Sequence, residues 1–142
     1  MIPALKNAEF LRYGVMHRNT YIDAPSVLTR RFSVKNNQRL FFAGQITGVE
    51  GYVESAASGL LVGIAIADEI LGRTPLELDA RTVCGALQTH ISTPTKDFQP
   101  MNANFGILAP LSLRIKDKKE RYKAYAERSL AVIASLRHCE ER

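Results

Sequence analysis

The sequence predicts an α/β fold, in which a few strands and a long helix after a glycine-rich turn are followed by a mainly helical C-terminal region. Three observations support this prediction. Residues 40–43 form an apolar, aromatic-rich run that is typical of a buried strand. Residues 44–51 contain three glycines and lead into a helical pattern, and residues 73–142 are mostly helical in periodicity. We expect one unit over residues 1–72 and a second over residues 73–142.

The first segment, residues 8–43, is expected to be largely extended, with polar residues 17–20 as an interruption. Pro25 and the polar run at residues 35–38 are expected in loops or turns. The strand at residues 40–43 is expected to be buried on both faces, because its side chains do not alternate between apolar and polar.

A long helix is expected over residues 52–71, because Gly72 is a natural C-terminal stop and Pro75 prevents continuation. One of its faces carries small residues at four-residue spacing: Ser55, Gly59, Gly63 and Ala67. Glycine inside a helix costs up to about 1 kcal/mol, so this face predicts close packing against a neighbouring element. Ordinary apolar burial is expected of a further set: Leu60, Leu61, Ile64 and Ile70.

The second unit is expected to begin with a helix that Asp79 caps and that runs to about Ile91, followed by a loop over residues 95–110. Asn102 and Asn104 in this loop are expected to cap turns rather than to bind substrate. A final helix over residues 117–137 begins with Asp117, which together with Glu120 has capping-box spacing. Its expected apolar face contains Tyr122, Tyr125, Ser129, Val132, Ile133 and Leu136.

The net charge of +5 is compatible with an acidic partner such as RNA. Candidate RNA contacts are the cations around the start of the final helix: Arg114, Lys116, Lys118, Lys119 and Arg121. The helix dipole disfavours cations at this end, which hints at an anionic partner, but a solvated face explains them equally well.

Cys84 and Cys139 have neither CxxC spacing nor a neighbouring metal-ligand cluster, so we expect two reduced thiols and no metal site. The most apolar stretch, residues 56–67, is shorter than the roughly 20 residues of a membrane span. With no secretory signal visible, the sequence indicates a cytoplasmic protein that does not cross a membrane.

The strand, the glycine-rich turn and the following helix form a shape that binds anions or cofactors. Backbone N–H groups at a helix N-terminus face such a ligand, and glycines allow the backbone to approach it. Because the turn matches neither GxGxxG nor GxxxxGK[ST], a plain strand–helix connection explains the spacing about as well.

Three segments resemble the folate- and FAD-dependent tRNA (uracil-5-)-methyltransferase family. They are FFAGQITGVEGYVESAASGLLVGI at residues 41–64, NAEFLRYGVMHRNTYIDAP at residues 7–25 and DFQPMNANFGILAPL at residues 97–111. The first is also similar to GidA, a flavoprotein family that modifies wobble uridine, but the other two favour the methyltransferases. The resemblance implies the C-terminal part of a FAD-binding, Rossmann-like flavoprotein.

The resemblance also implies roles for the matching residues. Cofactor contacts are implied along the turn: Gly44, Gln45, Ile46, Gly48, Val49, Gly51, Tyr52 and Glu54. For Glu50 and Glu54, satisfying backbone donors and meeting a basic group both remain open. A wall of the active site near folate and flavin is implied for Tyr13, His17, Arg18 and Asn19, with a structural histidine as the alternative at His17. The implied reaction methylates uridine C5 in tRNA with FAD, a methylene group from methylenetetrahydrofolate and reducing equivalents from NAD(P)H.

The sequence departs from the family in two respects. It has no GxGxxG, and the family's catalytic cysteines belong to segments upstream of Asn7, so neither Cys84 nor Cys139 is assigned a catalytic role. We therefore expect a native split or a truncation that is inactive alone and that needs an N-terminal FAD-binding portion as its partner. The incomplete sheet would expose an edge, which predicts a homo-oligomer or poor solubility. The competing reading is a non-catalytic RNA-binding module or remnant.

Overall fold

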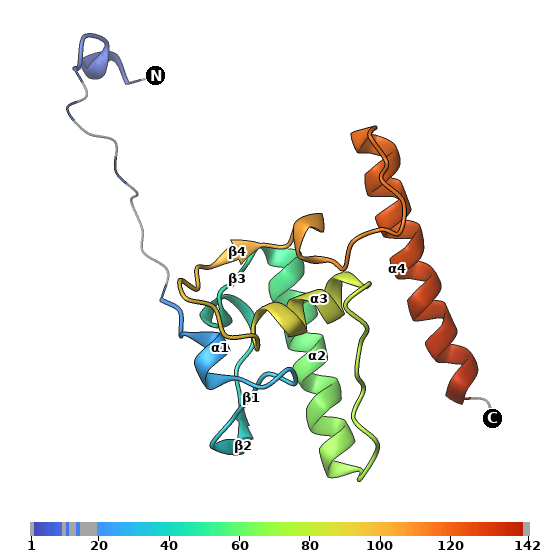
Figure 1. Ribbon diagram of the computed structural model, residues 1–142. Coiled ribbons are helices and arrows are strands. Elements are labelled where there is room, and N and C mark those ends of the chain that lie inside the picture. The colour runs from blue at the N-terminus through green and yellow to red at the C-terminus, as the bar shows by residue number, and fades with distance from the viewer. Residues whose placement is uncertain (1, 10, 12–13, 15–19, 141–142) are drawn as a thin grey trace.

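The computed structural model describes residues 2–9, 11, 14 and 20–140, of which residues 137–140 are described by their backbone alone (Figure 1). The chain is a mixed assembly of helices and two small sheets, in agreement with the predicted α/β class. Its elements in order are η1 (Pro3–Leu5), α1 (Ala24–Val27), β1 (Ser33–Val34), β2 (Asn37–Phe41), η2 (Gly44–Thr47), β3 (Val49–Glu50), α2 (Tyr52–Ile70), α3 (Val83–His90), β4 (Met101–Asn102), η3 (Phe105–Ile107) and α4 (Lys118–Glu140).

The two sheets have two strands each. In the first, β1 and β2 pair antiparallel through a tight turn at Lys35 and Asn36. In the second, β3 and β4 pair parallel, with Val49 opposite Met101. This second pairing joins the strand before α2 to the loop that follows α3. It therefore brings together residues 41–64 and residues 97–111, two of the segments that carry the family resemblance.

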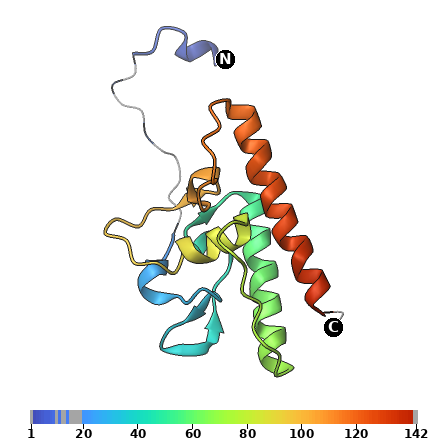
Figure 2. The same ribbon diagram turned by 45° about the vertical axis from the view of Figure 1, so that its right-hand side comes forward.

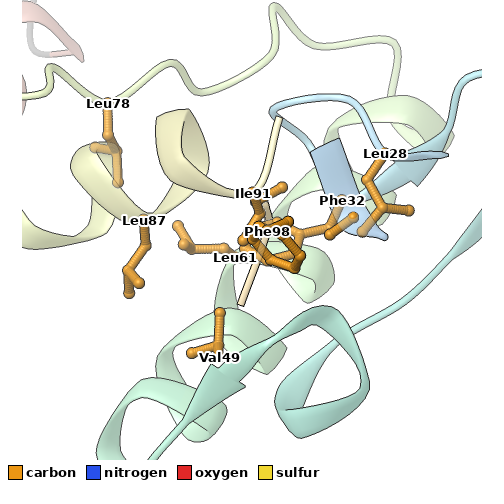
Figure 3. Close-up of a cluster of buried hydrophobic side chains, with 9 residues drawn as sticks. Leu28, Phe32, Val49, Leu61, Leu78, Leu87, Ile91 and Phe98 are labelled. Carbon is orange, nitrogen blue, oxygen red and sulfur yellow. The ribbon is translucent and has the colours of Figure 1, made fainter. Parts of the chain in front are cut away.

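A single buried cluster connects the segments on either side of residue 72. Its members are Ala24, Leu28, Phe32, Val49, Leu61, Leu78, Leu87, Ile91 and Phe98. Figure 3 shows Leu61, Ile91 and Phe98 at the middle of this cluster, with Val49 below them. Helix α3 and the glycine-rich turn are therefore held to α2 by one shared core.

The predicted helix at residues 52–71 is confirmed as α2. Its C-terminus forms as expected: the Leu71 N–H donates to the Ala67 carbonyl, and Gly72 adopts a left-handed φ of +61°. Leu61 is buried as predicted, but Leu60 and Ile70 are exposed, so the prediction of burial was wrong for these two residues.

The face of α2 with Gly59 and Gly63 is open rather than closely packed. A Cβ added at either glycine would meet no atom within 4 Å among the described residues. Within the described residues, the predicted close approach is therefore not made at these two glycines. Because α2 buries its opposite side against the core, its outer side keeps an exposed stripe: Tyr52, Val53, Leu60, Ile66 and Ile70.

The strand predicted at residues 40–43 lies earlier and is not buried. Strand β2 covers Asn37–Phe41, most of its residues are exposed, and Leu40 is 45% exposed. The reason is that β2 pairs only with β1 in the described part of the chain, and a hollow separates its residues Arg39 and Phe41 from Ile66 and Ile70 of α2. Pro25, expected in a loop, instead lies in the first turn of α1, where proline is tolerated because its missing N–H needs no partner.

Helix α3 begins three residues later than predicted, and its cap is Thr82 rather than Asp79. The Thr82 Oγ1 accepts the Gly85 N–H at 3.0 Å, whereas the Asp79 carboxylate accepts the Arg81 N–H in the preceding turn. In contrast, the predicted cap of the last helix is confirmed, since Asp117 Oδ1 accepts the Glu120 N–H at 2.8 Å. Helix α4 continues past residue 137 to Glu140 and forms one flank of the molecule (Figure 2).

Candidate functional site

The glycine-rich turn has a backbone that only glycine adopts without strain. The φ angles of Gly44, Gly48 and Gly51 are +74°, +81° and +99°. The turn is anchored to α2, because the Gly44 N–H donates to Ser58 Oγ at 2.7 Å, and it is closed on itself by Thr47 Oγ1, which donates to the Gly44 carbonyl at 2.7 Å. The chain thus passes from β2 through η2 and β3 to the start of α2 along a fixed path.

Gly48 is also required by close packing. A Cβ on Gly48 would lie 2.6 Å from Cε1 and from Cζ of the Phe98 ring, and this ring is part of the core. Next to it, the Met101 N–H donates to the Gly48 carbonyl at 3.0 Å. The segment at residues 97–111 therefore rests directly on the glycine-rich turn.

The N-terminus of α2 has no side-chain cap, and the Glu54 carboxylate lies beside Gly51 at this end. Gly51 provides no side-chain cap, and the first bond of the helix runs from the Ser55 N–H to the Gly51 carbonyl at 3.0 Å. The N–H groups of the first helical turn have no acceptor within their own helix and carry the positive end of its dipole. Tyr52 and Val53 in this turn are 98% and 79% exposed.

Glu54 connects this helix end to the second unit. Its Oε1 accepts the Ala103 N–H at 3.1 Å, so of the two alternatives for Glu54 the structure shows the backbone donor. A carboxylate in the first helical turn is also favoured by the dipole. Asn104 caps η3 as expected, with Oδ1 accepting the Gly106 N–H at 2.8 Å.

The side chains along the glycine-rich turn differ in what surrounds them. The space beside Gly48 is taken by the Phe98 ring and the space beside Gly51 by the Glu54 carboxylate, whereas a Cβ at Gly44 would meet only Ser55, at 3.8 Å. Gln45 is exposed and Ile46 is half-buried beside it. Val49 is buried as a whole residue and pairs with Met101 of β4, so the structure gives it a role in the core and not at a ligand surface.

The expected wall of the active site cannot be placed beside the turn, because Tyr13, His17, Arg18 and Asn19 lie outside the described residues. The nearest described neighbours are Thr20 and Tyr21, followed by Ile22, whose N–H donates to the Ile46 carbonyl at 2.9 Å. The chain that follows the wall segment is thereby tied to the glycine-rich turn.

The candidate RNA contacts lie on one side of α4 and on the loop before it. Arg114, Lys116, Lys118 and Lys119 are exposed. Arg121 donates to the carbonyls of Ile115 and Lys116 at 3.2 and 3.3 Å, so its guanidinium also shapes the loop.

Sequence reasoning missed an aromatic cluster beside these cations. The Phe105 ring packs against Tyr122 and Tyr125, with centroids 4.7 and 5.5 Å apart. Arg128 lies over Tyr125 and donates to the carbonyls of Ala109 and Pro110 at 2.6 and 2.8 Å. The three-residue steps from Tyr122 to Tyr125 and Arg128 placed these side chains on one helical face and could have revealed the cluster.

The described cysteine does not have the environment of a nucleophile. Cys84 is a half-buried free thiol, and burial raises its pKa above the usual value, which keeps it protonated. Within the described part of the chain, no group of three or more His, Cys, Asp and Glu side chains is arranged to hold a metal ion. Over the same residues, no helix has both the length and the apolar character of a membrane span.

Two comparisons with known proteins, one with a family model and one with individual relatives, both find similar proteins for this chain. The family model described as "Glucose inhibited division protein A" matches residues 1–74. The chain is also similar to proteins named methylenetetrahydrofolate–tRNA-(uracil-5-)-methyltransferase TrmFO: it is 59% identical over 92% of its length to that of Streptococcus suis and 56% identical over 96% to that of Bacillus cytotoxicus. A third, from Caldicellulosiruptor bescii, is 52% identical over 96% of the chain.

The chain spans about a third of the length of these relatives, with matches covering 30% and 32% of them. The matched family model covers more than half of the chain and includes the whole glycine-rich turn and α2. The chain therefore belongs to the glucose-inhibited division protein A family, and it is similar over most of its length to about a third of each of these TrmFO proteins.

Proposed function

We propose that this chain supplies the C-terminal part of an enzyme that methylates uridine C5 in tRNA with FAD and a folate methylene donor. The observation that carries the proposal is the left-handed glycine turn that leads into the uncapped N-terminus of α2. It occurs in a chain that is 52–59% identical to proteins named methylenetetrahydrofolate–tRNA-(uracil-5-)-methyltransferase TrmFO. In this proposal, the contacts to FAD come from Gly44 to Gly48 and from Gly51 to Glu54.

The chemistry that bound FAD supplies is the reduction of a folate-derived methylene group, with electrons from NAD(P)H. This chain would contribute positioning and electrostatics. The helix end at Tyr52 favours negative charge on a bound cofactor, and Glu54 holds the loop at Ala103 against that helix end. Activation of uracil by a thiolate would come from outside the chain, since Cys84 is half-buried and its raised pKa favours the protonated thiol.

The partner in this proposal is an N-terminal FAD-binding portion of the kind that the relatives have in addition. The outer side of α2 is the surface it would cover, because Gly59 and Gly63 permit close approach and Leu60 and Ile70 offer apolar area. Strand β2 presents an edge to the same portion or to a second copy. Without that portion, the chain would have no methyltransferase activity. The proposal also includes a boundary between two units after residue 72 and a cytoplasmic location.

Reconstitution tests the proposal directly. The chain is combined with the N-terminal portion of the Streptococcus suis relative, and methylation of tRNA uridine is measured with FAD, methylenetetrahydrofolate and NADH or NADPH. We expect activity only in the mixture. Gly63→Leu should abolish it by blocking close approach, whereas Ala131→Leu, which adds the same side chain to an exposed position of α4, should not. Full activity of the chain alone, or inactivity of a mixture that forms a stable complex, would overturn the proposal.

A second candidate function is a non-catalytic RNA-binding module. The observation in its favour is the set of exposed cations on α4 and the preceding loop, which does not depend on flavin. This candidate predicts RNA binding by a chain that never restores methylation, and the same reconstitution separates the two.

A further inference from the structure

We propose that a hollow between η3 and the start of α4 binds an unstacked nucleobase of the RNA. This inference rests on the proposed function, because it assumes that the cationic side of α4 contacts RNA. The hollow has a volume of about 310 Å³ and is lined by Val83, Ala103, Asn104, Phe105 and Tyr122. Its size is at the lower end of ligand pockets, roughly 300–1,000 Å³.

The aromatic rings of the hollow are held in place before any ligand binds. Phe105 is fixed between Tyr122 and Tyr125, at 40° to the first ring and 16° to the second. Arg128 Cζ lies over the Tyr125 ring, 5.1 Å from its centroid, and the guanidinium is held there by the hydrogen bonds that it donates to the carbonyls of Ala109 and Pro110. Because the rings are already ordered, a base that stacks on them loses little affinity to side-chain ordering.

Two cations adjoin the exposed ring. Lys118 Nζ and Arg121 Cζ lie 5.6 and 5.7 Å from the centroid of Tyr122, which is 39% exposed. Two ion pairs occur among the described residues, Arg81–Asp79 and Lys123–Glu127, and neither uses Lys118 or Arg121. No carboxylate neutralises either charge in these pairs, so both can attract the phosphates on either side of a base that enters the hollow, although the Arg121 guanidinium also donates to the Ile115 and Lys116 carbonyls.

Asn104 offers polar recognition beside the rings. Its Oδ1 accepts the Gly106 N–H, and its Nδ2 donates to the Asn102 carbonyl at 3.3 Å. A side-chain amide has two lone pairs on oxygen and two hydrogens on nitrogen, so each atom retains one further position. A base edge, which carries both donors and acceptors, matches that capacity.

The combination favours RNA over a protein segment as the occupant. Single-stranded or looped RNA is bound by aromatic side chains on which bases stack, together with cations along the backbone. The rings supply the first feature, and Lys118 and Arg121 the second. An apolar peptide would use the rings but would gain nothing from the unpaired cations.

The test compares two probes of equal length, a short single-stranded oligouridylate and an abasic ribose-phosphate oligomer. Their binding to the chain is measured by fluorescence anisotropy. We expect Tyr122→Ala to weaken oligouridylate binding roughly 5- to 150-fold, the range of one lost base stack, and to leave abasic binding unchanged. Tyr122→Phe should keep the affinity, because the ring remains. Lys119→Ala should weaken both probes equally, because it removes only a charge.

The outcomes separate this inference from the proposed function. If oligouridylate binds but Tyr122→Ala has no effect, or affects both probes alike, the nucleobase site is wrong while the RNA surface stands. If neither probe binds, both the RNA surface and the nucleobase site are overturned. The flavin-dependent role is tested separately by the reconstitution of methylation described above. A thermal melt of each variant shows that the fold is intact, which is expected because Tyr122 is 39% exposed and is not part of the buried core.

Discussion

Replacing Gly48 with alanine is expected to lower the free energy of unfolding by about 2–5 kcal/mol. The φ of +81° costs a residue with a Cβ roughly 1–2 kcal/mol. The added methyl group would also lie 2.6 Å from two carbons of the Phe98 ring, and overpacking of this kind costs about 1–3 kcal/mol. The ring has little room to move, because it is 8% exposed and lies 5.5 Å from His90.

The assay is urea unfolding followed by circular dichroism, and the chain offers a matched control. Gly59→Ala introduces the same side chain inside α2, where no described atom lies within 4 Å. It should stabilise the chain by about 0.5–1 kcal/mol, because alanine is the better helix former. The reasoning is refuted if Gly48→Ala and Gly59→Ala shift the free energy of unfolding in the same direction.

Three further predictions concern single residues. Glu54→Ala should cost about 1–2 kcal/mol in urea unfolding by leaving the Ala103 N–H without its acceptor, and Glu54→Gln should recover most of that; equal losses would contradict the bond. Burial lowers the pKa of His90 below 6.5, so the folded chain binds fewer protons there than the unfolded chain, and its free energy of unfolding should fall as the pH drops below 6.5. His90→Gln should flatten this decline in the free energy of unfolding with pH, and an unchanged decline would contradict the reasoning. Burial raises the pKa of Cys84, so in a Cys139→Ser variant iodoacetamide should modify Cys84 slowly until the chain is denatured, and rapid native labelling would be the opposite result.

Local signals in the sequence were sufficient for some elements. Helix α2 and the caps at Gly72 and Asp117 were predictable, because a capping bond or a left-handed residue is determined within a few neighbours. The glycine-rich turn was predictable for the same reason, as three glycines in eight residues favour positive φ.

Other features depend on contacts that the sequence does not encode locally. Thr82 and Asp79 are both capable caps. The structure uses Thr82, whose Oγ1 accepts the Gly85 N–H, and Gly85 packs so closely on the backbone of Leu78 and Asp79 that a Cβ would clash with their carbonyls. The choice of cap therefore depends on how α3 packs on the preceding segment. The parallel pairing of β3 with β4 joins two distant segments and leaves no local pattern.

Burial was the least predictable property of the candidate site. The apolar pattern at Leu40, Leu60 and Ile70 shows which side chains favour burial but not what covers them, and within the described chain nothing does. The same holds for Gly59 and Gly63, whose spacing predicts close packing that this chain does not contain. Each of these positions lies on the surface proposed to meet the N-terminal FAD-binding portion.

A flavin titration tests the central claim most directly. FAD fluorescence is followed as the purified chain is added, first alone and then with the N-terminal portion of the Streptococcus suis relative. Binding in the mixture alone is the predicted result, because residues 44–54 would form one wall of a site that both parts complete. Tight binding by the chain alone would contradict the claim that the site needs a second part, and no binding in either case would contradict the flavin role of the glycine-rich turn.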